Sequence, residues 1–157
     1  MRALFDSGGK DCRLAYELAG LDIDYSVAFT RNGKILNHGT EPKEGQYVIE
    51  LDGENVTAMV RGFLKAIQDL ELTEIIVGII NPVPMLHRVC RRTGCKLNAP
   101  LLKMDRKLVI QELLNRNIVA TIISGQFQGE VINQEFIDNH PDIDICGELG
   151  EYHTNAE

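Results

Sequence analysis

One apolar stretch constrains the fold of this chain more than any other part of its sequence. Residues 73–80, TEIIVGII, run from Thr73 and Glu74 into residues without a polar side chain, most of which are β-branched. A strand of this composition is typically buried on both faces, as in a parallel sheet that helices cover on each side. The stretch therefore predicts an α/β fold.

Strand and helix patterns alternate along the rest of the chain. The pair Asn32-Gly33 predicts a tight hairpin turn after the second strand. We therefore expect an open, mainly parallel, Rossmann-like sheet with helices on both faces and a β-hairpin insertion near residues 25–51. Further strands are predicted at 2–5, 24–30, 47–51 and 118–124, and helices at 11–20, 55–70, 82–94, 105–117 and 131–140.

Ligands of such sheets bind outside the carboxyl ends of the strands. Three loops are expected at that edge: SGGK after the first strand, INPVP after the strand at 73–80, and SGQFQGE after the strand at 118–124. Asn81 and Gly125, in the second and third of these loops, are therefore candidate nucleotide-binding residues. Asn81 equally suits a turn before Pro82.

Length and composition predict a single domain spanning residues 1–157, since 157 residues with 44% apolar content suffice for one core. Acidic residues near the start, and the lack of any run of about 18 apolar residues, predict neither a signal peptide nor a membrane span. We expect a cytoplasmic protein. Its four cysteines show no CxxC spacing, so the sequence predicts no zinc site.

The net charge of −7 is unevenly distributed. A basic stretch at residues 87–107 contains one acid, Asp105, whereas the rest of the chain is strongly acidic. This distribution argues against broad nucleic-acid binding and allows one basic surface for an anionic ligand. The basic residues of the stretch are Arg88, Arg91, Arg92, Lys96, Lys103, Arg106 and Lys107.

The hexapeptide SGGKDC, residues 7–12, lies between the first strand and the first helix. Glycines at this position let backbone N–H groups converge on an anion at the helix N-terminus, and Lys10 supplies a neutralising charge. Asp11 suits a polyphosphate only if it caps the helix or holds Mg²⁺. The spacing fits neither a Walker loop nor a dinucleotide fingerprint. A glycine turn that only introduces a helix remains an alternative.

Two motifs carry a family resemblance. SGGKDC is similar to the SGGxDS pyrophosphate-binding loop of the PP-loop ATP pyrophosphatases, which are adenine nucleotide alpha hydrolase-like proteins. Residues 144–154, DICGELGEYHT, resemble the GE-x-GEYxT signature of the diphthine-ammonia ligase group of that superfamily. The similarity covers about residues 3–20 and 60–154, and it implies a HUP-type nucleotide-binding sheet.

The resemblance also implies a set of site residues. In this family the loop holds the β- and γ-phosphates of ATP, with Mg²⁺ as cofactor, and the carboxy-terminal signature lies near the acceptor substrate or the metal. The implied catalytic residues are Lys10, Asp11, Glu148 and Glu151, with Gly150 beside them; the implied ATP-binding residues are Ser7, Gly8, Gly9, Lys10, Asp11 and Cys12; and Asp11 is the implied Mg²⁺ ligand.

The implied activity is amide formation by adenylation. A carboxylate attacks the α-phosphate of ATP, pyrophosphate leaves, and ammonia captures the acyl adenylate. The implied partners are ATP, ammonium and the diphthine of translation elongation factor 2, and an oligomer is left open. Two alternatives remain: a nucleotide-binding module without ligase activity, and a PP-loop tRNA-thiolating enzyme.

Three departures from the family pattern bear on these alternatives. Cys12 replaces the usual Ser, Asp6 adds a negative charge before the loop, and a compact hairpin replaces a longer insertion. Cys12 lies in the first turn of a helix beside Lys10, a setting that lowers the pKa of a thiol. His153 is either a general base or an exposed residue.

Overall fold

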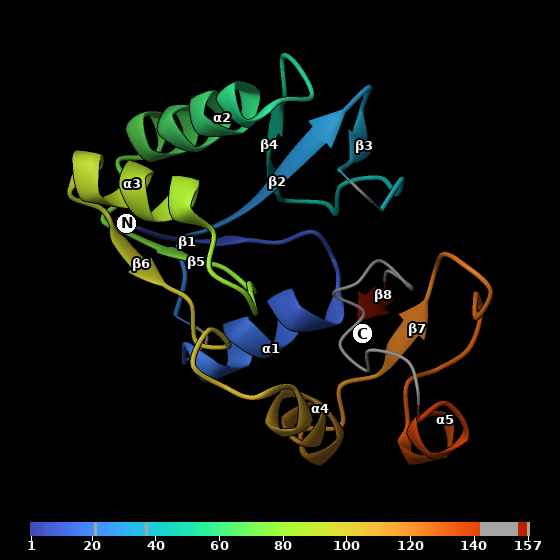
Figure 1. Cartoon of the computed structure of the whole chain (residues 1–157). Helices are drawn as coiled ribbons and strands as arrows, with labels where there is room; N and C mark the ends of the chain where they lie inside the picture. The colour runs from blue at the N-terminus through green and yellow to red at the C-terminus, as the bar shows by residue number, and fades with distance from the viewer. Residues whose placement is uncertain (21, 37, 142–153, 157) are drawn as a thin grey trace.

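The computed structural model describes residues 1–20, 22–36, 38–141 and 154–156. It is an α/β structure with a mostly parallel mixed sheet (Figure 1). The strands are β1 (Arg2–Phe5), β2 (Tyr25–Arg31), β3 (Lys34–Ile35), β4 (Tyr47–Glu50), β5 (Glu74–Ile76), β6 (Lys96–Asn98), β7 (Ala120–Ile122) and β8 (Thr154–Ala156). The helices are α1 (Lys10–Leu18), α2 (Val56–Asp69), α3 (Pro84–Thr93), α4 (Arg106–Asn115) and α5 (Gln134–Asn139).

The main sheet has β1 at its centre. Ala3 of β1 pairs in parallel with Tyr25 of β2 on one side and with Ile75 of β5 on the other. The parallel strands follow the order β4-β2-β1-β5-β6, and β3 adds an antiparallel pairing with β2. Counted along the chain without β3, this is the order 3-2-1-4-5 of Rossmann-like sheets. The predicted α/β class with a mainly parallel sheet is confirmed.

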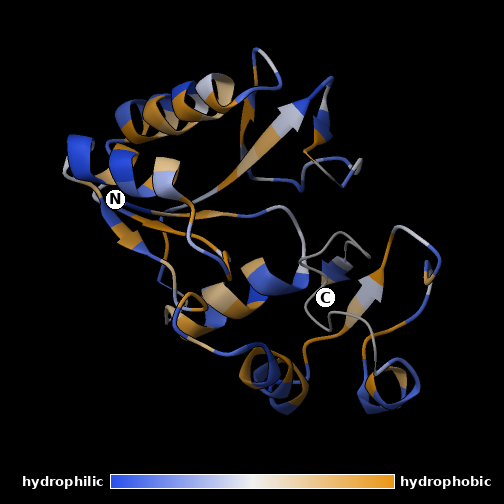
Figure 2. Cartoon of the chain, in the orientation of Figure 1, coloured by the Kyte–Doolittle hydropathy of each residue, from blue (hydrophilic) through white to orange (hydrophobic). Residues whose placement is uncertain are grey.

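Helices cover both faces of the sheet (Figure 1). On the face covered by α2 and α3, the rings of Phe5, Phe29 and Phe63 lie with centroids 4.9–5.4 Å apart. Helix α2 approaches the sheet closely there, since a Cβ on Gly62 would lie 2.8 Å from Leu51 Cδ2. On the other face, Leu14 of α1 belongs to a buried cluster with residues of α4. Apolar residues are concentrated on the sides of the helices that face the sheet (Figure 2).

The helices begin and end where local chemistry permits. Asn55 and Asp105 accept N–H bonds from the first turns of α2 and α4, which satisfies backbone donors that have no partner within the helix. Helix α3 opens on Pro84, whose missing N–H costs nothing at a first position. It ends at Gly94, which adopts φ +73° in the left-handed region.

Two expectations about the sheet are wrong. The strand predicted at 118–124 does not join the main sheet: β7 pairs antiparallel with β8, and Ile122 lies opposite Thr154. The edge position beside β5 is taken by β6, whose Lys96-Leu97-Asn98 sequence is too short and polar to signal a strand. The expected hairpin turn at Asn32-Gly33 is present, but β4 extends the parallel sheet and is no part of an insertion.

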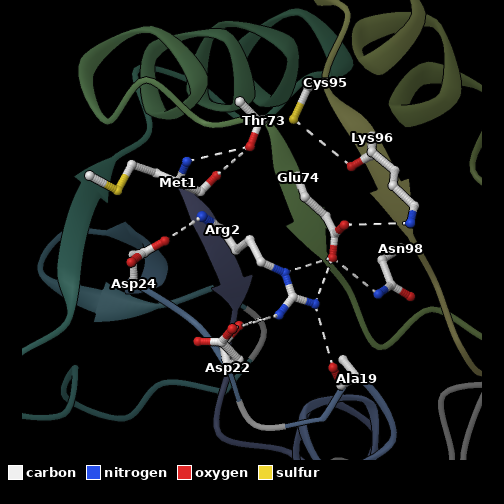
Figure 3. A network of polar contacts seen from close by, with 10 residues as sticks. All are labelled: Met1, Arg2, Ala19, Asp22, Asp24, Thr73, Glu74, Cys95, Lys96 and Asn98. Atoms are coloured by element: carbon white, nitrogen blue, oxygen red, sulfur yellow. Dashed lines mark hydrogen bonds and ion pairs between the residues drawn. The ribbon is translucent and has the colours of Figure 1, made fainter.

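A polar network ties together the first residues of β1, β5 and β6 (Figure 3). Glu74 is 14% exposed, and its Oε2 accepts hydrogen bonds from Arg2 Nη2 at 2.7 Å, Arg2 Nε at 2.9 Å and Asn98 Nδ2 at 3.3 Å. Lys96 Nζ lies 3.6 Å from the other carboxylate oxygen of Glu74, Oε1. Burial raises the pKa of Glu74, but the hydrogen bonds from Arg2 and Asn98 and the charges of Arg2 and Lys96 outweigh it and leave the pKa below its usual value.

We predict that Glu74→Gln lowers the free energy of unfolding at pH 7 by about 2 kcal/mol, because it removes charge-assisted bonds in a largely buried setting. Because the folded-state pKa is depressed, this contribution exists above the unfolded-state pKa and is lost as pH falls through the folded-state pKa. Urea unfolding should therefore show the two proteins converging in acid. Asp52→Asn, which breaks the exposed Arg61–Asp52 pair, is the control and should change little. Equal stability of Glu74→Gln and wild type at pH 7 would contradict the prediction.

Candidate functional site

The SGGKDC loop begins at the carboxyl end of β1, beside β5. These two strands flank the point at which the strand order reverses, where Rossmann-like sheets open a crevice. Gly8 adopts φ +90°, a conformation that a residue with a Cβ rarely adopts. The Gly8 N–H donates to Asp6 Oδ1 at 2.7 Å, and Asp6 Oδ2 lies 3.7 Å from Lys43 Nζ. The carboxylate of Asp6, just before the loop, thus already accepts a hydrogen bond from one of the loop's amide donors.

Lys10 is a buried cation at the start of α1. Its side chain is 3% exposed, and its Nζ donates to both carboxylate oxygens of Asp11, at 3.0 and 3.1 Å. The pairing offsets the cost of burying the ammonium group. The structure therefore places the two charged residues of the motif, Lys10 and Asp11, side by side.

The carboxy-terminal strand β8 lies against this loop. Thr154 Oγ1 accepts the Lys10 N–H at 3.0 Å in a buried position, and the Ala156 N–H donates to the Gly8 carbonyl at 2.8 Å. A Cβ on Gly9 would lie 3.5 Å from the Thr154 carbonyl oxygen. Thr154 is a site residue that the sequence reasoning missed, although it closes the GELGEYHT motif. Two segments 144 residues apart in the sequence thus meet at the loop.

Cys12 is held as a neutral thiol. Burial, followed by the charge of Asp6 and, more weakly, that of Asp11, raises its pKa to about 11, and its hydrogen bonds to Ser7 only partly offset this. Its Sγ donates to the Phe5 carbonyl at 3.4 Å and lies 3.6 Å from Ser7 Oγ. The expectation that the helix start and Lys10 lower this pKa is therefore wrong, because burial and the charges of Asp6 and Asp11 outweigh what lowers it.

An apolar cavity of about 340 Å³ opens beside the loop at the carboxyl ends of β1, β2 and β5. Its polar lining comes from four residues: Asp6, Ser7, Cys12 and His38. The β2–β3 hairpin and the first turn of α3 form opposite walls, so the compact hairpin shapes the site. The apolar lining includes Phe5, Val27, Phe29, Ile35, Leu36, Met59, Phe63, Val77, Ile79, Val83, Met85 and Leu86.

A smaller cavity of about 210 Å³ lies on the side of the loop that faces α1. The backbone of Gly8 and Gly9 borders it together with Arg13, Ser26 and Lys43. Asp6 lines both cavities. The loop is therefore bordered by an apolar cavity on one side and a partly basic cavity on the other, a division that suits a ligand with an apolar end and an anionic end.

Gly78, two residues beyond the end of β5, positions the loop, and the sequence reasoning assigned it no role. A Cβ at this residue would lie 2.6–2.7 Å from the backbone of Asp11 and Cys12, closer than real Cβ contacts. The first turn of α1 can therefore rest on the end of β5 only because residue 78 is glycine. A glycine inside an otherwise β-branched strand was the available signal, because such a glycine often marks a close backbone approach.

The remaining predicted residues do not join this loop. Asn81 is exposed and lines a separate open cavity with residues of the α4 start, including Asp105. Gly125 is exposed, with φ +79°, and lines neither cavity at the loop. Four residues named from the sequence lie outside the described residues: Glu148, Gly150, Glu151 and His153.

Within the described ranges, no cluster of three or more His, Cys, Asp or Glu side chains is arranged to hold a metal ion. No helix there is long and apolar enough to cross a membrane. The sequence matches no protein-family model. A search of curated proteins likewise finds no match.

We predict that Gly78→Ala destabilises the protein by about 2 kcal/mol, because a backbone contact cannot be relieved by a side-chain rotation. Thermal unfolding measures the change. Gly53→Ala is the matched control, since a Cβ there makes only an ordinary 3.5 Å contact with Ala58 Cβ, and its effect should be much smaller. Equal effects of the two substitutions would show that α1 does not depend on the close approach at Gly78.

We also predict that Cys12 resists alkylation. A pKa of about 11 leaves roughly a hundredfold less thiolate at pH 8 than the ordinary value of 9.0. Peptide mapping after iodoacetamide treatment should show slow labelling of Cys12, compared with free glutathione, that accelerates as pH rises toward 11. Labelling of Cys12 in the folded protein as fast as that of glutathione at pH 8 would contradict the raised pKa.

Proposed function

We propose that this chain is a single-domain PP-loop ATP-binding protein that forms an amide by ATP-dependent adenylation. One observation carries the proposal. A loop with the PP-loop sequence SGGKDC follows the central strand of a 3-2-1-4-5 sheet, with the buried Lys10–Asp11 pair at its helix start and an apolar cavity beside it. The order of the strands makes this edge a nucleotide-binding crevice in Rossmann-like sheets in general.

The two cavities suit the two ends of ATP. The apolar cavity, walled in part by Phe5 and Phe29, offers aromatic and aliphatic surface for an adenine ring. The other side of the loop offers the backbone of Gly9 and the cations Arg13 and Lys43 to a polyphosphate. We infer that ATP spans the loop from one cavity to the other.

The residues at the loop also fit Mg²⁺. Asp6 lines the proposed phosphate cavity, and Asp11 follows in the first turn of α1, where it pairs with Lys10. Mg²⁺ in nucleotide sites is commonly held by one or two carboxylates, with the phosphates and water completing the shell. A preformed protein cage is therefore not required. When bound, Mg²⁺ would neutralise the charge that develops on the departing pyrophosphate.

The chain's own residues then have separate roles. Lys10 brings a positive charge to the departing pyrophosphate, and Asp11 holds that ammonium group in position in the free protein. The acceptor carboxylate attacks the α-phosphate of ATP and takes the adenylyl group, and pyrophosphate leaves. Ammonia then attacks the acyl adenylate and displaces AMP to give the amide. On the family resemblance, the acceptor is diphthine on translation elongation factor 2, and Glu148 and Glu151 act at its side of the site.

A nucleotide-binding module without ligase activity is the second candidate, and a specific observation favours it. Two amide donors of the loop, at Gly8 and Lys10, already donate to Asp6 and Thr154. They are therefore not available to stabilise the charge that develops on a departing pyrophosphate. A thiolating enzyme has less support, because a persulfide-transferring cysteine needs an accessible thiolate and burial holds Cys12 protonated. The difference between the first two candidates lies in pyrophosphate release, which only a ligase performs.

We predict that wild type binds α,β-methylene-ATP with Mg²⁺ and that Lys10→Ala/Asp11→Ala weakens binding at least about tenfold. Removing both partners avoids leaving one buried charge unpaired. The matched control, Arg61→Ala/Asp52→Ala, removes an exposed ion pair on α2 and should bind as wild type does. Calorimetry measures the affinities, and circular dichroism verifies the fold of each variant.

Catalysis is tested with wild type, ATP, Mg²⁺, ammonium and diphthine-bearing elongation factor 2. Release of AMP and pyrophosphate in equal amounts supports the ligase. Tight nucleotide binding without pyrophosphate release supports the binding module. Unchanged nucleotide affinity in Lys10→Ala/Asp11→Ala, or no nucleotide binding by wild type, contradicts both.

A further inference from the structure

Helix α3 carries three arginines on its solvent-exposed side. Arg88, Arg91 and Arg92 lie at positions i, i+3 and i+4, which places them on one face of the helix, and all three are exposed. The opposite side of α3 is buried through Leu86 and Val89 in the main core. The arginines are therefore presented by a fixed element. We call Arg88, Arg91 and Arg92 the α3 arginine face. The C-terminal turns of α3 are strongly hydrophilic (Figure 2).

These arginines differ from most cations of the protein. In the described part of the chain, no acidic side chain forms an ion pair with Arg88, Arg91 or Arg92, although acids outnumber bases in the sequence by 23 to 16. By contrast, the following cations each pair with an acid: Arg2, Lys10, Arg13, Arg31, Lys34, Lys43, Arg61, Lys65, Lys96 and Arg116.

Helix stability does not account for the arrangement. Arg91 and Arg92 lie in the last turn of α3, where cations interact favourably with the helix dipole. Arg88 lies before that turn, and like charges at i, i+3 and i, i+4 repel one another. The arginine face therefore carries more charge than the termination of α3 at Gly94 requires.

We propose that the α3 arginine face docks a short acidic segment of a partner protein, through carboxylates of Asp or Glu side chains. Each guanidinium can donate two parallel hydrogen bonds to one carboxylate, a forked geometry that an ammonium group lacks. All three cations on the face are arginine. The chain is acidic elsewhere, so the face is a local region of opposite sign to the partner segment.

The small extent of the face favours a protein segment over nucleic acid. Arg88 and Arg92 are four residues apart, so their Cα atoms are separated by only about 6 Å along the helix axis, whereas nucleic-acid binding proteins commonly neutralise about 6–10 phosphates along a track. Lys103 and Lys107 also form no ion pair with a described acid, but Lys103 precedes α4 and Lys107 lies in its first turn, and α4 covers the opposite face of the sheet (Figure 1). They cannot extend the arginine face into such a track.

The proposal is independent of the nucleotide site. It is tested with the whole chain and an acetylated octaglutamate peptide in about 50 mM salt, where charge screening is weak. We expect NMR amide shifts to concentrate at residues 84–94. Arg88→Gln/Arg91→Gln/Arg92→Gln should weaken peptide binding about tenfold, because it removes three charge pairs. Its thermal midpoint should change little, since the lost interaction of Arg91 and Arg92 with the helix dipole is offset by relief of the repulsion among the three arginines.

Two variants serve as controls. Arg61→Gln/Lys65→Gln removes two exposed cations from neighbouring α2 that already pair with Asp52 and Asp69, and its affinity should stay within about twofold of wild type. Arg88→Lys/Arg91→Lys/Arg92→Lys keeps the charge and removes the forked geometry, so its affinity should fall between those of the other two.

Three outcomes overturn the proposal. These are no peptide binding by wild type, equal binding by the triple Gln variant, and tighter binding of a 20-nucleotide RNA or of phosphatidylserine vesicles than of the peptide. The last outcome would assign the face to a polynucleotide or a lipid surface. The proposal of an acidic protein segment is supported if octaglutamate binding is lost in the triple Gln variant and retained in the α2 variant.

Discussion

The structure depends on the pairing of β1 between β2 and β5. This four-residue strand has Ala3 and Leu4 paired on both sides, so its backbone is fixed by two parallel ladders. Its alternate side chains supply both cores: Phe5 joins the aromatic cluster under α2, and Leu4 packs with Ala15 of α1. The strand therefore fixes the polar network at one end of the sheet and the SGGKDC loop at the other.

The loop is also fixed from outside the central sheet. Gly78 brings the first turn of α1 onto the end of β5, and β8 bonds to Gly8 and to the Lys10 amide from a part of the sequence about 144 residues away. A loop held by these long-range contacts keeps its shape without ligand. Such preorganisation favours binding, because less conformational freedom is lost when the ligand arrives.

Local sequence patterns predicted what local physics determines. The Asn32-Gly33 turn, the strand–loop–helix unit around SGGKDC and a buried strand within 73–80 follow from hydrophobic period and turn chemistry. The structure contains them, although the strand β5 covers only Glu74–Ile76 of that stretch. The β7–β8 pairing and the placement of β6 depend on contacts between distant segments, which no periodicity encodes. The Cys12 prediction was wrong for the same reason, since helix position and a neighbouring lysine argue for a low pKa and tertiary burial decides otherwise.

Charge balance at the loop sets a condition on the ligand. Asp6 pairs with Lys43, and Asp11 pairs with Lys10. The formal charges of these four side chains therefore sum to zero. A polyphosphate that entered alone beside Gly8 and Gly9 would meet the Asp6 carboxylate, which lines that cavity, and this is unfavourable in a partly buried site. A divalent cation reverses that sign, since the same carboxylates then become ligands or neighbours of the metal. The arrangement therefore suits a polyphosphate that arrives with its metal better than a bare anion, and it makes the two aspartates as important to the proposed site as the glycines.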